Sequence, residues 1–115
     1  MDFALTDEQR MIVETTRAFV ETELYPHEAE VERTGHLRME LIRELQAKAM
    51  AAGLYAANMP EEVGGAGLDT LTWLLYEKEL GKANYALHWT AVARPSNILL
   101  AGTEEQKERY LYPCI

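Results

Sequence analysis

Cysteine is almost missing from this sequence, and histidine is scarce. A single thiol, Cys114, stands among 115 residues together with three scattered histidines. One thiol cannot close an intramolecular disulfide, and the chain lacks the Cys and His clusters that hold structural zinc. No histidine has a glutamate three residues before it, so the Glu-x-x-His pairs of helical di-iron proteins are missing too. We therefore expect a reducing compartment and no metal site.

Basic residues are few, because 11 Lys and Arg stand against 19 Asp and Glu and give a formal net charge of −8 at pH 7. This field repels phosphates, so nucleic acid and anionic lipid are not expected partners. The acids gather in residues 1–35, where nine acids and three bases give −6. We interpret this segment as a solvent-facing helix surface, and an acidic docking surface is the alternative.

Long hydrophobic runs are missing as well. No stretch approaches the roughly 18 apolar residues of a membrane-spanning helix. The first residues have neither the basic start nor the apolar run of a secretory signal. We therefore expect a cytoplasmic protein without membrane insertion. The 115 residues, 48% of them hydrophobic and 26% charged, instead suit one folded domain with its own core.

Two short segments have the form of a capping box, in which a Thr hydroxyl and a Gln side chain satisfy the first amides of a helix. These segments are Thr6–Gln9 and Thr103–Gln106. The first predicts a helix that runs to about Leu24, before Pro26. The second predicts a last helix that Pro113 ends.

The middle of the chain carries three more helical patterns. Apolar residues recur there at three- and four-residue steps, and they predict helices over residues 39–52, 70–80 and 84–89. Residues 28–33 are an acidic stretch between helices. The helix over 70–80 is apolar nearly all round, which is typical of a central, buried helix. Pro and Gly are dense in residues 58–67, so we expect a structured loop there.

Strand signals are absent. No run alternates apolar and polar residues with β-branched content. Ile98, Leu99 and Leu100 are expected to form part of the core. The sequence thus predicts an all-α domain over residues 1–115, built as an antiparallel bundle of about six helical segments.

A search for convergent polar groups finds little chemistry. Cys114 has no histidine placed to activate it. Glu61–Glu62 and Glu104–Glu105 are adjacent acids, but neighbours on a helix point to different faces and do not form an acid and base pair. The glycines of residues 64–67 lack the strand and the lysine of a phosphate-binding loop. We expect no catalytic and no cofactor-binding residue in this chain.

Four motifs, in one order and spacing, carry a resemblance. They are Phe3-x-Leu5-Thr6-x-Glu8-Gln9, Gly53-Leu54, Pro60–Gly67 and Gly102–Leu111. Together they resemble the N-terminal helical domain of the acyl-CoA dehydrogenase family, and the match covers essentially the whole chain. One departure is Arg38, which stands where the family often has a proline, so the advantage of proline in a first helical turn is lost.

The resemblance implies a flavoprotein that uses FAD to desaturate an acyl-CoA thioester between its α and β carbons. It implies that the catalytic glutamate and most flavin contacts belong to a β-barrel domain and a C-terminal helical domain, which follow beyond Ile115 and are absent from this chain. The implied partners are an acyl-CoA substrate, an electron acceptor flavoprotein and, at full length, further copies of the protein. The isolated chain is then expected to bind neither flavin nor thioester well and to be inactive.

The resemblance also implies that this domain supplies one wall of the acyl pocket, at about residues 89–97. The side chains expected to face substrate there are Thr90, Ala93, Arg94 and Ser96. An arginine beside an aliphatic tail would be an expensive desolvated charge unless it were paired. We therefore expect Arg94 to point to water, and the alternative is a substrate with a polar or anionic group.

Two other functions stay open at this point. One is a different reaction on the same scaffold, such as an acyl-CoA oxidase or a related flavin monooxygenase. The other is a stand-alone helical interaction module without catalysis. If the chain is a fragment, part of its apolar content covers a partner domain. That view predicts exposed apolar residues on the helix over 70–80 and around the bend at 89–97.

Overall fold

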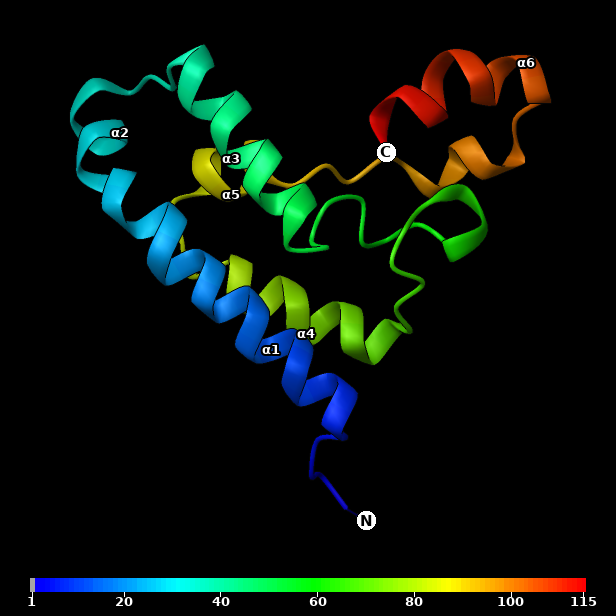
Figure 1. Cartoon of the computed structure of the whole chain (residues 1–115), viewed down its shortest axis with the longest axis horizontal. Coiled ribbons are helices and arrows are strands. Elements are labelled where there is room, and N and C mark those ends of the chain that lie inside the picture. Colours follow the sequence, from blue (N-terminus) through cyan, green and yellow to red (C-terminus); the bar gives the residue numbers. More distant parts are fainter. Residues whose placement is uncertain (1) are drawn as a thin grey trace.

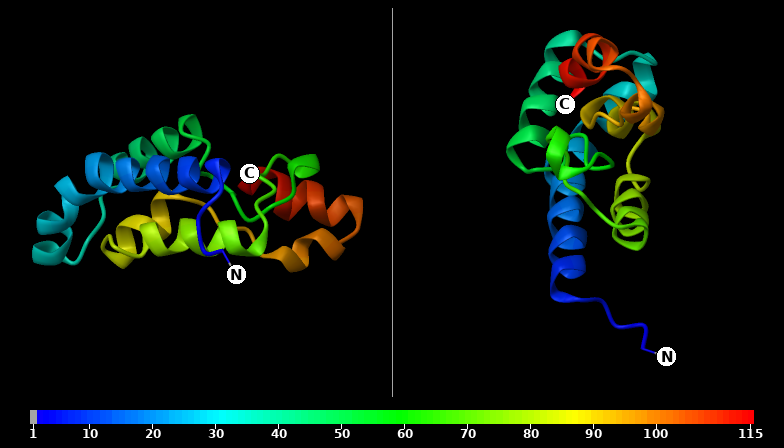
Figure 2. Two further views of the ribbon diagram at one scale, coloured as in Figure 1. Left: turned by 90° about the horizontal axis from the view of Figure 1, so that it is seen from below. Right: turned by 90° about the vertical axis from the view of Figure 1, so that its right-hand side faces the viewer.

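The computed structural model describes residues 2–115, which fold into helices and connecting turns without a strand. The α-helices in this part of the chain are α1 (Asp7–Phe19), α2 (Glu28–Thr34), α3 (Met39–Ala51), α4 (Thr70–Leu80), α5 (Tyr85–Ala91) and α6 (Glu104–Gln106). They form a flat body with extents of 43 × 42 × 20 Å (Figures 1 and 2). The predicted all-α fold is confirmed. Within residues 2–115, no helix is both long and apolar enough to cross a membrane.

Both predicted capping boxes are present. The Thr6 hydroxyl accepts from the Gln9 amide at 3.1 Å, and the Gln9 side chain accepts from the Thr6 amide at 2.9 Å. Thr103 and Gln106 repeat the arrangement at 3.2 Å and 2.9 Å. Each box satisfies two amides that an uncapped helix would leave without partners.

The two capped helices both widen before a proline. The first helix reaches Leu24, as predicted, through a π-helical turn at Val20–Leu24, and α6 continues through another at Lys107–Leu111. Pro26 and Pro113 then lie in short 3-10 turns. A proline ring crowds the carbonyl four residues before it and has no N–H to donate. The regular α-helical hydrogen bonds are therefore disfavoured before each proline, which accounts for the wider π-helical turn.

Helix α2 corrects the sequence analysis, which assigns only an acidic stretch to residues 28–33. Gly35 ends this helix in the left-handed conformation, with a φ of 64°. Asn84, at the start of α5, donates its backbone N–H to the Glu28 carboxylate at 2.7 Å and its side-chain amide to Glu32. Two of the acids therefore hold a tertiary contact, which a local charge pattern does not reveal.

Helices α1 and α4 lie side by side and run in the same direction (Figures 1 and 2). The Arg17 guanidinium of α1 donates to Glu79 of α4 at 2.9 and 3.3 Å, and Lys82 donates to the same carboxylate at 2.8 Å. Glu79 is buried, and the hydrogen bond from Arg17 is the main reason why its pKa is lowered. The two helices are parallel rather than antiparallel as expected, because residues 35–69 return the chain to the end of the pair where α1 starts before α4 begins.

The main core involves α1, α3, α4 and α5. Its largest fully buried side chains are Leu24, Leu45, Leu54, Tyr76, Leu80 and Leu87. Helix α4 is not buried all round, contrary to the expectation, because Leu71 and Leu74 are each 57% exposed. These two residues share one helix face, and no element of the described chain covers it. An apolar pattern all round this helix therefore does not mean burial all round.

A smaller apolar cluster joins the glycine-rich loop to the C-terminal helix. Its buried members are Ala56, Met59 and Leu111. Leu99 and Leu100 pack partly against it, whereas Ile98 is 77% exposed and does not belong to the core as expected. These residues lie in a 3-10 helix, Asn97–Ala101, whose three residues per turn point consecutive side chains in three directions. One of the three must then face outward.

The glycine-rich loop turns tightly around Met59, in agreement with the predicted structured loop. The Gly67 amide donates to the Met59 carbonyl at 2.9 Å, and the Gly65 amide donates to the Pro60 carbonyl at 2.9 Å. A Cβ atom on Gly65 would lie 2.1 Å from the Met59 carbonyl oxygen, far inside contact distance. Gly65 is therefore required for close backbone approach.

We predict that Gly65→Ala lowers the free energy of unfolding by at least about 2 kcal/mol, because the new methyl group overlaps a buried carbonyl. Gly81→Ala is the matched control, since its Cβ would lie 3.3 Å from the Glu77 carbonyl oxygen and its φ is an ordinary −64°. We expect the control to change stability by less than about 1 kcal/mol. Urea unfolding followed by circular dichroism measures both, and a Gly65→Ala variant as stable as Gly81→Ala would contradict the close approach.

Candidate functional site

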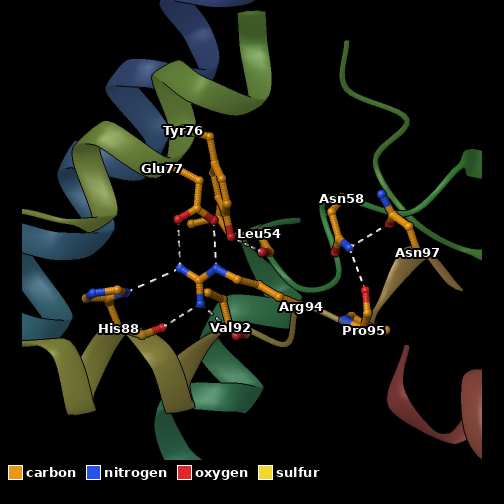
Figure 3. Close-up of polar contacts among 9 residues, drawn as sticks. All are labelled: Leu54, Asn58, Tyr76, Glu77, His88, Val92, Arg94, Pro95 and Asn97. Atoms are coloured by element: carbon orange, nitrogen blue, oxygen red, sulfur yellow. Dashed lines mark hydrogen bonds and ion pairs between the residues drawn. The ribbon is translucent and has the colours of Figure 1, made fainter. Parts of the chain in front are cut away.

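The candidate residues lie at the end of α5 and on the bend that follows it, of which Figure 3 shows Val92, Arg94 and Pro95. Two hydrogen bonds hold this bend against the segment after α3. The Ala56 amide donates to the Ala93 carbonyl at 3.0 Å, and the Asn58 side chain donates to the Pro95 carbonyl at 2.6 Å. Ala56 is fully buried and adopts a left-handed φ of 52°, which costs a non-glycine residue roughly 1 kcal/mol. The backbone of the bend is thus fixed from the inside.

Arg94 is the polar centre of the bend. Its Nε and Nη2 atoms donate to the two carboxylate oxygens of Glu77 at 2.7 and 3.3 Å. Its Nη1 atom donates to the carbonyls of His88 and Val92, each at 3.4 Å, and Nη2 also lies 3.3 Å from His88 Nδ1 (Figure 3). A guanidinium has five N–H groups, and these five contacts use them all.

This geometry corrects the expectation for Arg94. Its side chain is only 10% exposed, so it does not point to water. A polar or anionic substrate group is not needed either, because Glu77 supplies the counter-charge from α4 within the same chain. A paired, hydrogen-bonded guanidinium can be buried without the cost that an isolated charge would carry. Arg94 therefore positions the bend.

His88 is buried beside Arg94. Burial first, and the Arg94 charge second, lower the pKa of His88 below its ordinary value, while Glu77 opposes this effect. Because arginine can only donate, His88 Nδ1 must be the acceptor in their contact, which assigns the proton of the neutral ring to Nε2. The site thus favours a neutral histidine.

Tyr76 connects α4 to the segment that follows α3. Its hydroxyl donates to the Leu54 carbonyl at 2.7 Å, and burial raises the pKa of this phenol above its ordinary value. The Trp73 ring lies against the Tyr76 ring with centroids 5.1 Å apart. The hydroxyl of Tyr76 is therefore a structural donor, held away from solvent.

The other expected residues offer no reactive group. The Thr90 hydroxyl donates to the Ala86 carbonyl at 2.7 Å inside α5, and the Thr90 carbonyl accepts from Gln46 of α3 at 3.1 Å. Ala93 is half-buried, and Ser96 is exposed. The structure brings all four expected residues to one end of α5 and its bend, but it gives them different surroundings.

Sequence reasoning missed the most exposed aromatic pair of the site. Tyr85 and Trp89 of α5 are 66% and 53% exposed, and their rings stack with centroids 5.4 Å apart and an angle of 18°. The Arg94 guanidinium carbon lies 5.1 Å from the Trp89 ring centroid. The spacing of four residues places both rings on one helix face and could have indicated the pair.

The expectation of exposed apolar residues around this region is confirmed. Large apolar side chains at least half exposed occur both on α4 and from α5 to the turn after the bend: Leu71, Leu74, Tyr85, Trp89 and Ile98. Single exposed apolar residues are common on any protein. Exposed apolar residues on neighbouring segments are typical of surface that another domain or a ligand covers.

The comparisons with known proteins agree with this architecture. Residues 6–115 match the family model described as "Acyl-CoA dehydrogenase, N-terminal domain". The chain belongs to the acyl-CoA dehydrogenase family. It is 36% identical, over 98% of its length, to a probable acyl-CoA dehydrogenase, YngJ, of Bacillus subtilis, and covers 30% of that protein.

Two solved structures resemble this acyl-CoA dehydrogenase domain. A chain from work on the electron transferring flavoprotein of Acidaminococcus fermentans matches 99% of it with a TM-score of 0.77 and 36% identity. The acyl-CoA dehydrogenase of Geobacillus kaustophilus matches 99% of it with a TM-score of 0.74 and 27% identity. In both cases this chain covers 30% of the other chain. It therefore spans about a third of the length of the relatives it matches.

We predict that Glu77→Gln lowers the free energy of unfolding by about 2–3 kcal/mol, because it removes the counter-charge of a buried guanidinium. The effect stays below that of a fully buried pair because the Glu77 side chain is 29% exposed. Glu44→Gln is the control, since Glu44 pairs with Lys48 on the surface and is 55% exposed. We expect it to cost less than about 0.5 kcal/mol. Similar losses in both variants, measured by urea unfolding, would contradict the role of Glu77.

The lowered pKa of His88 makes stability depend on pH. Below the ordinary value of 6.5, the unfolded chain binds a proton that folded His88 resists, so stability present at pH 7.5 is lost as the pH falls through 6.5 toward the folded pKa. We predict that His88→Gln reduces the slope of unfolding free energy against pH in this window. His36→Gln, at an exposed position, is the control. A slope that His36→Gln reduces as much as His88→Gln would refute this assignment.

Proposed function

We propose that residues 1–115 are the N-terminal domain of a flavin-dependent acyl-CoA dehydrogenase, which desaturates an acyl-CoA thioester between the α and β carbons. The family match over residues 6–115 supports this activity. The structural observation that supports it is the fixed bend. Arg94 is paired there with Glu77 in the interior, whereas α5 beside it exposes the side chains of Tyr85 and Trp89.

The proposed task of this domain is to form one wall of the acyl pocket. Ser96 is exposed and Thr90 and Ala93 are half-buried, so these three positions can lie along a bound acyl chain. Arg94 acts indirectly, by holding the bend in one shape. A wall of fixed shape lowers the entropy cost of binding, because little of it must become ordered with the substrate.

Two hollows formed by residues 2–115 offer no free cation for the pyrophosphate of a flavin nucleotide. One hollow of about 390 Å³ is lined by Met50, Gly53, Tyr55, Gly64, Gly65, Ala66 and Ile115, none of which is a cation for a pyrophosphate. Another, of about 570 Å³, contains Lys48, which Glu23 and Glu44 already engage at 2.7 and 2.9 Å. We therefore assign FAD, and the carboxylate base, to a β-barrel and a C-terminal helical domain outside this chain.

The proposed partners follow from the same assignment. They are an acyl-CoA substrate, an electron acceptor flavoprotein and, at full length, further copies of the protein. The likeness to a chain from work on an electron transferring flavoprotein supports the acceptor class. The single thiol of the chain supports the proposed cytoplasmic location.

The proposed longer protein, with this chain as its N-terminal domain, tests the proposal. We expect it to purify with bound flavin and to reduce a dye when an acyl-CoA is added, with the 2-enoyl-CoA as product. The 115-residue chain, purified in parallel, is expected to be colourless and inactive. Flavin absorbance, dye reduction and mass analysis of the thioester product are the measurements.

Three outcomes would contradict the proposal. Stoichiometric hydrogen peroxide from O₂ during desaturation indicates an acyl-CoA oxidase. Insertion of oxygen into the substrate indicates a flavin monooxygenase. A stop codon directly after Ile115, with a stably folded chain that acts on no acyl-CoA, indicates a stand-alone interaction module.

A further inference from the structure

We propose that the ring pair Tyr85–Trp89 touches the far end of the acyl group, and that it selects acyl groups ending in a flat aromatic ring. This inference rests on the proposed function, because it names the substrate class of the same pocket. It replaces Arg94 with the two rings as the residues that determine specificity at this wall.

The ring pair is exposed but ordered. Tyr85 and Trp89 are each more than half exposed, and yet their rings stack nearly parallel, with an angle of 18° between planes. Two large aromatic side chains bury little of their own surface in this arrangement. A partner that covers them therefore gains much apolar contact. A flat partner makes the largest contact area with them, because it can stack on rings that are nearly parallel.

Buried residues hold both rings from below. The Arg94 guanidinium carbon lies 5.1 Å from the Trp89 centroid, and all of the N–H groups of Arg94 are engaged by Glu77, His88 and Val92. The His88 ring meets the Tyr85 ring edge-on, with centroids 5.5 Å apart and an angle of 85°. The pair is thus set before any ligand binds, which favours recognition by shape.

The surroundings of the pair favour a neutral acyl end. Arg94 has no N–H left for a carboxylate, and the Thr90 hydroxyl donates within α5. An anionic or strongly polar acyl end would therefore lose its water without gaining a partner. A long aliphatic chain gains apolar contact, but it lacks the additional stacking interaction that an aryl ring makes with Tyr85 and Trp89.

The 115-residue chain contains an internal control for a binding experiment. It has two tryptophans, Trp89 in the exposed pair and Trp73, which is half-buried against Tyr76. With ¹⁵N-labelled indoles, each gives one N–H signal. The probes are the N-acetylcysteamine thioesters of 3-phenylpropanoate and of 3-cyclohexylpropanoate, whose acyl groups each have nine carbons and differ only in whether the ring is aromatic and flat.

We expect the 3-phenylpropanoyl probe to shift the Trp89 signal with an apparent affinity about fivefold or more above that of the 3-cyclohexylpropanoyl probe. The Trp73 signal should move little with either probe. Tyr85→Leu should abolish the difference between probes. Tyr110→Leu is the matched control, because Tyr110 is 52% exposed and also packs against an arginine, but lies in another element. The preference should persist in that variant.

Equal affinities for the two probes, or shifts of Trp73 as large as those of Trp89, overturn the inference. Line broadening of Trp89 that grows with protein concentration and disappears in Tyr85→Leu also overturns it, because the face would then bind a second copy. Dye reduction by the longer protein reports separately on the proposed function. Turnover of straight-chain acyl-CoA without aryl preference and without an effect of Tyr85→Leu would leave that function standing and refute the ring pair.

Discussion

The partly buried ion pair of Arg94 and Glu77 is the constraint on which the rest of the site depends. A guanidinium with 10% exposure is tolerable only if its charge is paired and its N–H groups are all used. Meeting both conditions requires a carboxylate from α4, the carbonyl and ring of His88 in α5, and the carbonyl of Val92 in the bend. These three segments must therefore adopt one relative arrangement. The same arrangement fixes the Trp89 ring, since it lies against the Arg94 guanidinium.

Local signals explain how much of the fold could be predicted. The boxes at Thr6 and Thr103 satisfy helix amides with residues three positions away, so their chemistry is complete within four residues of sequence. Helix α2 is different, because Val31 is its only buried residue and its contacts to α5 come from Asn84, more than 50 residues away. The parallel order of α1 and α4 likewise depends on Arg17 and Glu79, which no local pattern relates.

The sequence places the four expected residues on one bend, but it does not give the neighbours of Arg94, for the same reason. The bend at 89–97 could be located by likeness to the family, and the structure keeps all four expected residues at one end of α5 and its bend. The burial of Arg94 depends on Glu77, which is 17 residues earlier in the chain and on another helix. Sequence spacing gives each residue its helix face but not the neighbour that the face meets. Tyr85 and Trp89, by contrast, are four residues apart on one helix, so their proximity was visible in the sequence.

The acids of residues 1–35 form an exposed surface, as expected, and some of them also hold internal contacts. None of the nine is buried, and six are exposed. Glu28 and Glu32 accept from Asn84, Glu23 accepts from Lys48, and Glu30 accepts from Arg38. Four of the nine acids therefore join segments of the chain to one another. The polar groups of Arg94 and Tyr76 are directed inward as well. Since these charged and polar side chains form contacts within the chain, the exposed apolar and aromatic side chains of α4 and α5 are the surface best suited to bind a ligand or a covering domain.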